Sequence, residues 1–409
     1  MKIAIAQLNP IIGDLPGNAE KILAAAQQAV DSGAQLLLTP EMSLSGYPPR
    51  DLLLRPAFVS AMAHQLEAIA AKLPANLFVL VGYAQPNPLA DEKGEKPLFN
   101  SLALLHGGQN QAQFHKRLLP TYDVFDDKRY FAPGPGDNLL EIDGVKIGIT
   151  ICEDAWNDEE FWGRRSYGLN PLADLVDQGA QLIVNVSGSP YSLGKQRLRE
   201  EMLGSSAARY GVPMLYVNQV GGNDDVVFDG SSMGVNPDGV VCRAQAFEPD
   251  FCVVEFDADA IAPGPMCPLA DSEAAELWGA LVLGVRDYVR KCGFSKVLLG
   301  LSGGVDSALV AAIAAAALGP ENVLGVLMPS PYSSGHSVSD AQQLAQNLGI
   351  RTETLPIETL MQGYDHTLSG LFAGTEFGVA EENLQSLIRG NLLIAMSNKF
   401  GHLVLRKRN

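Results

Sequence analysis

The feature that most constrains this chain is a short segment of glycine and serine between a buried strand and an alanine-rich helix. The strand is predicted over 296–301, and the segment that follows reads Ser302-Gly303-Gly304-Val305-Asp306-Ser307. Two adjacent glycines let backbone N–H groups approach phosphate oxygens, the helix offers its positive N-terminal end, and the serines add hydroxyl donors. Serine and glycine also form ordinary turns, but the strand, this segment and the helix together favour a pyrophosphate-binding loop.

The loop lacks the Lys-Ser/Thr pair of a Walker motif, whose lysine contacts the β- and γ-phosphates. Cleavage between the α- and β-phosphates is therefore favoured over γ-phosphoryl transfer. Pyrophosphate would then leave, and Asp306 could bind Mg²⁺. This pattern indicates adenylation of a substrate.

The composition is that of a globular enzyme with more than one domain. The chain has 409 residues, 47% of them hydrophobic and 18% charged, and a formal net charge of −17. Its length suggests two or three domains, and two are predicted. The acidic balance argues against nucleic acid as a partner, because such binding depends on basic patches.

The same composition indicates a reducing compartment. The five cysteines are few, odd in number and widely spaced, which predicts no disulfide framework. The N-terminus reads as a strand rather than a signal peptide. No uncharged apolar run reaches about 18 residues, so no membrane association is expected and the protein should be cytoplasmic.

Strands and helices alternate along the chain, which predicts an α/β fold. Residues 1–257 form one predicted domain, and a proline-rich stretch over 258–271 has no periodicity and marks a linker. In the first domain, the runs 226–228 and 233–235 are separated by Asp229-Gly230, a turn signal for an antiparallel hairpin, so mixed sheets are expected.

Residues 272–409 form the second predicted domain. A helix is expected over 272–291 with Ser272 as its N-cap, followed by alternating strands and helices. This alternation predicts a doubly wound parallel sheet, and the phosphate loop lies at the carboxyl end of its first strand, where such folds bind ligands.

Three chemically different side chains lie directly after predicted strands of the first domain: Glu41, Lys116 and Cys152. Cysteine supplies a nucleophile that must become a thiolate, and a nearby ammonium group would lower the pKa of the thiol and stabilise an oxyanion. A carboxylate would serve as general base. Each residue alone has a structural explanation, but together they fit amide hydrolysis through a thioester.

The motifs around these residues resemble those of known families. Residues 1–257 resemble the carbon-nitrogen hydrolase (nitrilase) superfamily, with Glu41 in PEMSLSGYPPRDLL, Lys116 in HKRLLPTYDVFDDKRYF and Cys152 in ICEDAW. Residues from 272 resemble the synthetase domain of NAD⁺ synthetases. The order of the two domains is similar to that of glutamine-dependent NAD⁺ synthetases, which are ligases of NAD biosynthesis.

This resemblance implies a fold and an activity. It implies a nitrilase-like α/β/β/α sandwich followed by an incomplete adenine nucleotide α-hydrolase-like domain. The first domain would act as a glutaminase that releases ammonia from L-glutamine. The second would bind ATP, adenylate deamido-NAD⁺ with Mg²⁺, and let ammonia displace AMP to give NAD⁺.

The resemblance also implies roles for further residues. Tyr122, Ser189 and Lys195 fall at positions that contact glutamine, and the backbone of Glu153 would contribute to the oxyanion site. Asn383 would contact deamido-NAD⁺. The implied ATP-binding residues are Gly300, Leu301, Ser302, Gly303, Gly304, Val305, Asp306, Ser307 and Met328, with Asp306 also the metal ligand.

Three departures from the family pattern stand out. Asp127 occupies a position where the family has glutamate, which predicts weaker glutaminase activity because the side chain is shorter. Leu387 stands where relatives usually have arginine. The sequence stops at Asn409, before the family's second Mg²⁺-ligating glutamate and further substrate residues, so we expect a fragment or a frameshifted product.

Two alternatives remain open. The protein could be another glutamine-dependent adenylating amidotransferase, such as a GMP or asparagine synthetase, although those enzymes have glutaminase domains of other kinds. It could also be a glutaminase or nucleotide-binding protein without synthetase activity. A homo-oligomer is expected from the resemblance, whereas the sequence does not indicate how ammonia travels.

Overall fold

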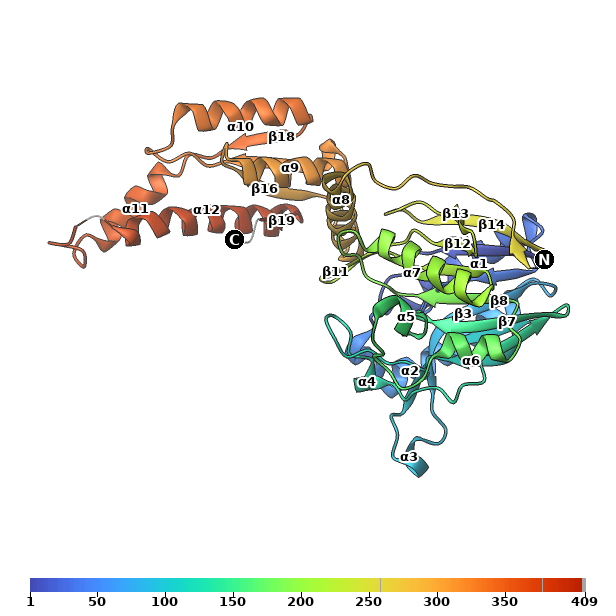
Figure 1. Ribbon diagram of the computed structural model, residues 1–409. Coiled ribbons are helices and arrows are strands. Elements are labelled where there is room, and N and C mark those ends of the chain that lie inside the picture. The colour runs from blue at the N-terminus through green and yellow to red at the C-terminus, as the bar shows by residue number, and fades with distance from the viewer. Residues whose placement is uncertain (258, 377, 407–409) are drawn as a thin grey trace. The chain divides into compact units, whose positions relative to one another are not determined.

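The computed structural model describes residues 1–257, 259–376 and 378–406. The chain divides into two compact units, Met1–Ala280 and Leu281–Asn409, which are called the N-terminal and C-terminal units below (Figure 1). Residue 258, the first of the predicted linker, lies outside the described residues. Residues 260–261 of that linker form a short strand paired with the preceding one. The domain boundary at 258–271 stays a prediction.

The N-terminal unit contains two large mixed sheets and a small one, with strand orders β15-β14-β1-β2-β3-β4-β5, β13-β12-β9-β8-β7-β6 and β10-β11. The first comprises β1 (Lys2–Gln7), β2 (Leu36–Leu38), β3 (Phe78–Pro86), β4 (Leu98–His106), β5 (Gln109–His115), β14 (Asp250–Asp257) and β15 (Ala260–Ile261). The second comprises β6 (Leu139–Ile142), β7 (Val145–Ile151), β8 (Leu182–Ser187), β9 (Met214–Asn218), β12 (Met233–Asn236) and β13 (Gly239–Arg243). The small sheet is β10 (Val220–Asn223) with β11 (Val226–Asp229).

The helices of the N-terminal unit are α1 (Leu15–Asp31), α2 (Pro56–Lys72), α3 (Ala90–Lys93), α4 (Asp127–Tyr130), α5 (Glu159–Trp162), α6 (Pro171–Asp177) and α7 (Lys195–Tyr210), with 3₁₀ turns η1 (Arg50–Leu54) and η2 (Cys152–Ala155). Helices α1 and α2 cover the outer face of the first large sheet, and α6 and α7 cover that of the second. Side-chain alternation along β1 explains the layering: Ile3 and Ile5 pack between the sheets, whereas Ala4 and Ala6 pack under α1 and α2. The α/β/β/α sandwich is therefore confirmed.

The predicted hairpin of 226–228 with 233–235 is wrong. β11 pairs with β10, whereas β12 pairs with β9 and β13 in a different sheet. The segment between β11 and β12 does not fold into a hairpin, because Ser232 bonds to β1 instead. Both the backbone N–H and the hydroxyl of Ser232 donate to Gln7 Oε1, each at 2.9 Å. The turn over 237–239 joins the antiparallel strands β12 and β13.

The C-terminal unit is built on one parallel sheet with strand order β18-β17-β16-β19. Its elements are α8 (Glu273–Lys291, within which the two units divide), β16 (Val297–Leu301), α9 (Val305–Leu318), η3 (Pro320–Asn322), β17 (Val323–Leu327), α10 (Gly335–Leu348), β18 (Arg351–Thr354), α11 (Glu358–Leu368), α12 (Val379–Phe400) and β19 (Leu403–Leu405). Ser272 caps α8 as predicted, accepting from the Ala275 N–H at 3.2 Å.

Helices pack on both faces of this sheet. The face of Leu299 packs with residues of α9 and α10, and the face of Leu298 packs with Ile388 of α12. This arrangement confirms the doubly wound parallel sheet. The strand order reverses at β16, and the phosphate loop follows that strand at the point where such sheets bind ligands.

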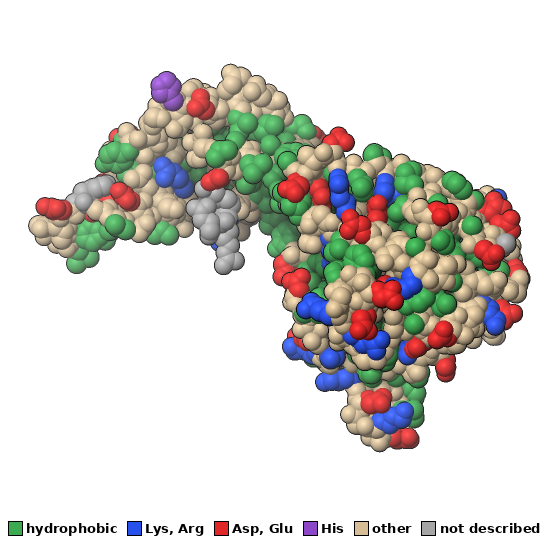
Figure 2. Space-filling model, viewed as in Figure 1, with side chains coloured by type: hydrophobic (Ala, Val, Ile, Leu, Met, Phe, Trp, Pro, Cys, Tyr) green, Lys and Arg blue, Asp and Glu red, His purple; other side chains and the backbone are tan. Residues whose placement is uncertain are grey.

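Acidic and basic side chains are both scattered over the visible face of the N-terminal unit (Figure 2). Among the described residues, no helix combines the length and the apolar character needed to cross a bilayer.

Candidate active sites

Glu41, Lys116 and Cys152 follow the ends of β2, β5 and β7, as the sequence predicted. The Lys116 Nζ atom lies 2.9 Å from Glu41 Oε1, and neither side chain is exposed to solvent. Cys152 is also buried, and its thiol is electrostatically coupled to both groups. The structure thus brings together three residues that lie far apart in the sequence.

A second carboxylate, Asp127, completes a buried charge network around the lysine. Asp127 Oδ2 lies 2.6 Å from Lys116 Nζ, so the shorter aspartate side chain does reach the lysine. Tyr47 donates its hydroxyl to Asp127 Oδ1 at 3.2 Å. Burial alone would lower the pKa of Lys116, but Asp127 and Glu41 raise this pKa well above its ordinary value. The lysine therefore stays positively charged.

Two further groups orient the Glu41 carboxylate. Asn100 Nδ2 donates to Glu41 Oε1 at 2.6 Å, and the backbone N–H of Gly188 donates to Glu41 Oε2 at 2.7 Å. Both carboxylate oxygens are thus held by donors, which fixes the direction of the proposed general base.

Cys152 occupies a strained position at the start of η2. Its φ angle of 47° lies in the left-handed region, which non-glycine residues rarely adopt. Asn185 Nδ2 donates to the Cys152 carbonyl at 3.3 Å. Asp154 fixes the following turn, because its Oδ1 accepts from the Leu118 N–H at 2.8 Å and its Oδ2 from the Ile151 N–H at 3.1 Å.

Lys116 lowers the pKa of the Cys152 thiol, as expected, but other effects outweigh it. Burial and the negative charge of Glu41 raise the pKa of Cys152 well above its ordinary value, and the opposing effect of Lys116 is smaller. The resting thiol is therefore neutral, and it must lose its proton to a base as it attacks.

Two tyrosines hold the side chain of Glu153, which is only 5% exposed. Tyr122 donates its hydroxyl to Glu153 Oε2 at 2.8 Å, and Tyr167 donates to Glu153 Oε1 at 2.9 Å. Tyr122 itself is 52% exposed, and partial burial and the charges of Glu153 and Cys152 all raise the pKa of its hydroxyl. This arrangement places a desolvated carboxylate one residue after the nucleophile.

Ser189 and Lys195 are the other two predicted glutamine contacts. Both follow β8 in the sequence, whereas Cys152 precedes it. Ser189 is buried, and its carbonyl and hydroxyl accept from Arg199 at 3.0 and 3.2 Å. Lys195 begins α7, and its Nζ lies 5.5 Å from the ring centroid of Trp156. Burial lowers the pKa of the Lys195 ammonium group.

Sequence reasoning missed several residues around this site. Arg199 is fully buried and pairs with Asp229 at 2.6 Å, and Asn100 and Tyr167 hold the two carboxylates described above. In the sequence, Arg199 is one of several charged residues on the helix that begins at Lys195. A charged residue on a helix is expected to be solvated, so nothing in the sequence indicated its burial.

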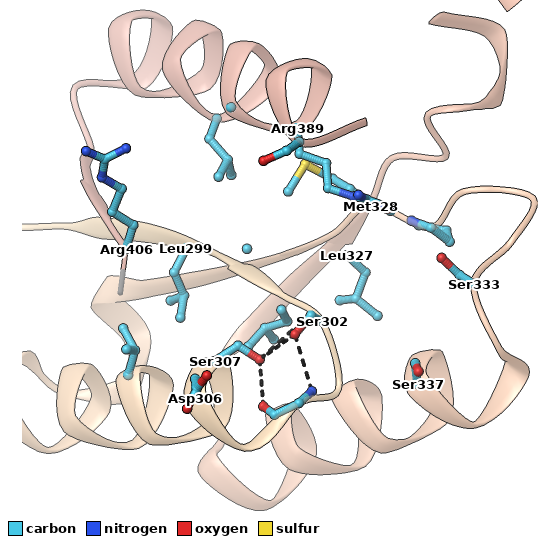
Figure 3. Close-up of a pocket in the computed structure, with 18 of the residues that line it drawn as sticks. Leu299, Ser302, Asp306, Ser307, Leu327, Met328, Ser333, Ser337, Arg389 and Arg406 are labelled. Atoms are coloured by element: carbon cyan, nitrogen blue, oxygen red, sulfur yellow. Dashed lines mark hydrogen bonds between the residues drawn. The ribbon is translucent and has the colours of Figure 1, made fainter. Parts of the chain in front are cut away.

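The second candidate site is the loop between β16 and α9, whose serines and glycines bond to one another (Figure 3). The Ser302 and Ser307 hydroxyls lie 3.1 Å apart, and the backbone N–H of Gly304 donates to Ser302 Oγ at 3.3 Å. Ser307 Oγ also donates to the Gly304 carbonyl at 2.9 Å. The loop is thus shaped before any ligand binds.

Gly303 is required by the way this loop meets α10. Its φ angle is +79°, and a Cβ atom there would lie 2.3 Å from the carbonyl oxygen of Ser337. Only glycine fits without moving the backbone.

A cavity of about 610 Å³ opens beside the loop and lies wholly within the C-terminal unit. Among the predicted ATP residues, Gly300, Leu301, Ser302, Gly304, Asp306, Ser307 and Met328 line it. Gly303 and Val305 are not among its lining residues, and Val305 is exposed. Asn383 is exposed on α12 and does not line the cavity.

Asp306 lies in the first turn of α9 and faces this cavity (Figure 3). In the described part of the chain, no group of three or more acidic, histidine or cysteine side chains is arranged to hold a metal ion. Mg²⁺ commonly binds through one or two carboxylates together with substrate phosphates and water. A single aspartate beside a phosphate loop fits that mode of binding.

Comparison with known proteins matches each unit to a family. A carbon-nitrogen hydrolase model matches residues 2–265, and an NAD synthase model matches residues 277–409. A glutamine-dependent NAD(+) synthetase of Synechocystis sp. is 55% identical over 100% of this chain and 74% of its own length.

Solved structures agree with these matches. A glutamine-dependent NAD⁺ synthetase from Acinetobacter baumannii, in complex with ADP, superposes with a TM-score of 0.91 at 37% identity, covering 100% of this chain and 74% of the other. A nitrilase-superfamily amidase from Nesterenkonia covers 63% of this chain and 92% of its own length, with a TM-score of 0.52 and 26% identity. The chain therefore spans about three quarters of the synthetases that it matches.

Proposed function

Because the chain belongs to the glutamine-dependent NAD⁺ synthetases, we propose that its two sites divide one ligase reaction between them. Ammonia is released from L-glutamine at Cys152, and deamido-NAD⁺ is adenylated by ATP at the Ser302–Ser307 loop. Ammonia then displaces AMP and gives NAD⁺. The observation that carries this proposal is the buried contact between Lys116 and Glu41 beside the Cys152 thiol.

In the first half-reaction, Glu41 accepts the thiol proton as Cys152 Sγ attacks the amide carbon of glutamine. The tetrahedral oxyanion is stabilised by the Lys116 ammonium and the backbone N–H of Glu153. The C–N bond then breaks, and Glu41 returns its proton to the departing ammonia. A water molecule, deprotonated by Glu41, hydrolyses the thioester and releases glutamate.

The residues around Cys152 also explain the selection of an α-amino acid amide. Glutamine carries an ammonium and a carboxylate on its α-carbon. A selective site therefore needs an anionic side chain for the ammonium and a cationic side chain for the carboxylate. The desolvated Glu153 carboxylate suits the α-ammonium group, and the Lys195 ammonium suits the α-carboxylate. The Tyr122 and Ser189 hydroxyls complete the polar lining.

In the second half-reaction, the carboxylate of deamido-NAD⁺ attacks the α-phosphate of ATP. The loop N–H groups and the Ser302 and Ser307 hydroxyls bind the departing pyrophosphate. Asp306 would hold Mg²⁺, which would neutralise phosphate charge when bound. The ADP complex of the Acinetobacter relative supports a nucleotide site in this chain. Asn383 would contact deamido-NAD⁺ from α12.

We also propose that the protein works in the cytoplasm, which the scarcity of cysteine favours, and as a homo-oligomer, which the family resemblance favours.

A labelling experiment tests the transfer of nitrogen. With glutamine whose amide carries heavy nitrogen, the NAD⁺ formed from deamido-NAD⁺ and ATP should carry the label in its carboxamide, and excess unlabelled ammonium should dilute it. NAD⁺ that forms without any label would contradict the coupling of the two sites.

A further inference from the structure

Arg389 reaches into the cavity of the C-terminal unit from α12 and approaches the phosphate loop from across that cavity (Figure 3). Its Nε donates to the carbonyl oxygen of Met328, directly after β17, at 3.0 Å. This bond fixes the plane of the guanidinium group at the end of the strand beside β16. The side chain is partly buried, and it was not assigned to ATP by the sequence.

Among the residues that the structure describes, no aspartate or glutamate forms an ion pair with Arg389. Burial also lowers the pKa of its guanidinium group, although arginine remains charged at neutral pH. A partly desolvated cation that lines a cavity is stabilised when an anion binds there. The anion that the loop is built for is a phosphate group.

The position of Arg389 indicates which phosphate it meets. The loop follows β16, and Met328 follows β17, which is the hydrogen-bonded neighbour of β16. Adjacent strands lie about 5 Å apart, so a nucleotide bound with its pyrophosphate on the loop has its α-phosphate within the span between the two strand ends. The loop provides no lysine for this purpose, and a cation from α12 supplies the missing charge.

We propose that Arg389 binds the α-phosphate of ATP and stabilises the transition state of adenylation. This inference rests on the proposed function of the second site. The attacking carboxylate and the α-phosphate are both negative and repel each other as they approach. The new bond joins a carboxylate oxygen to the α-phosphorus, and the bond from that phosphorus to the bridging oxygen breaks as pyrophosphate leaves. The two NH₂ groups of the guanidinium, which the bond to Met328 does not use, can pair with both anions and reduce their repulsion.

Binding of a nucleotide series tests the inference without requiring turnover. Calorimetry with adenosine, AMP and ADP would be compared for the wild-type protein and the Arg389→Gln, Arg389→Lys and Arg351→Gln variants. Arg351 is an exposed arginine on β18 whose ion pair among the described residues is with Glu353, which makes it a matched control. Glutamine at 389 can still donate to the Met328 carbonyl but carries no charge.

We expect Arg389→Gln to weaken AMP and ADP binding by about tenfold, the effect of losing one charge-assisted hydrogen bond. Adenosine binding should change less than about twofold by the same reasoning, and Arg389→Lys should recover part of the loss. Arg351→Gln should bind all three ligands as the wild type does.

Equal losses for adenosine and AMP would overturn the inference, because they would show that Arg389 only supports the Met328 segment. A loss in an Arg406→Gln variant with none in Arg389→Gln would also overturn it, since Arg406 lines the same cavity. Failure of the wild-type protein to bind ADP would instead count against the nucleotide site itself.

Discussion

At the scale of single residues, the hydrolytic site works through buried charges that compensate one another. Lys116 lies between Glu41 and Asp127, and this pairing makes it tolerable to remove all three from water. The thiol beside them is kept neutral rather than ionised. Glu41 must therefore remove the thiol proton during attack, and the protonation state of the thiol can be measured.

The first prediction concerns the pH dependence of Cys152 alkylation. Because the pKa of the thiol is raised, the thiolate fraction should grow about tenfold per pH unit up to at least about pH 9. The rate of modification by iodoacetamide, measured by mass spectrometry of the Cys152 peptide, should rise in parallel. Cys152→Ala provides the background from exposed Cys292. A rate plateau between about pH 6 and 8 would instead indicate a preformed thiolate.

The second prediction concerns recognition of the α-ammonium group. Glu153→Gln should lower kcat/KM for glutamine by about 10- to 100-fold, since a charge-assisted contact is lost. For 4-carbamoylbutanoate, which lacks the α-amino group, the value should hardly change. Glu159→Gln is the control, because Glu159 is exposed and pairs with Arg165. An equal decrease for both substrates would show that Glu153 only supports the turn.

At the scale of elements, the phosphate loop depends on the strand before it and on the helices beside it. β16 lies in the middle of a parallel sheet, and α9 begins directly after the two glycines. The backbone of Gly303 packs against the start of α10 near Ser337. The shape of the loop is thus set by contacts that a side chain at this position would break.

The third prediction follows from that contact. Gly303→Ala should weaken ADP binding by about tenfold or more, because an alanine there has both an unfavourable φ angle and a backbone clash. Calorimetry measures the affinity. Gly335→Ala, also near the start of α10 but with open space around it, should bind ADP normally. An alanine at 303 without effect would mean that the loop does not hold phosphate in this conformation.

The sequence predicted most elements because their signals are local. β8 and β16 are short apolar runs bounded by polar or glycine residues, and the ends of these runs could be read directly. The hairpin after β11 was predicted wrongly because a local turn signal at Asp229-Gly230 competes with bonds from Ser232 to Gln7, 225 residues away in the chain. No local pattern reports such a partner.

The same limit applies to the sites. Motif resemblance was enough to choose Glu41, Lys116 and Cys152, and the structure brings them together. The partners that orient them could not be read from the sequence, since Asn100 and Gly188 contact Glu41 across 59 and 147 residues. The neutral state of the thiol also depends on burial, which one sequence does not reveal.

At the scale of the whole molecule, the proposed reaction is divided between two units that carry different chemical steps. Cys152 and its partners belong to the N-terminal unit, and Asp306 and the loop belong to the C-terminal unit. Ammonia is the only species that must pass from one step to the other. The two steps should therefore be separable by substitution.

The most direct test of this account compares Cys152→Ala and Asp306→Ala with glutamine or with ammonium as the nitrogen source. Cys152→Ala should form NAD⁺ only when ammonium is supplied, because the adenylating site is untouched. Asp306→Ala should form no NAD⁺ from either source, yet still release some ammonia from glutamine. If Cys152→Ala loses synthesis from free ammonium as well, or keeps synthesis from glutamine, the division of labour between the two sites is contradicted.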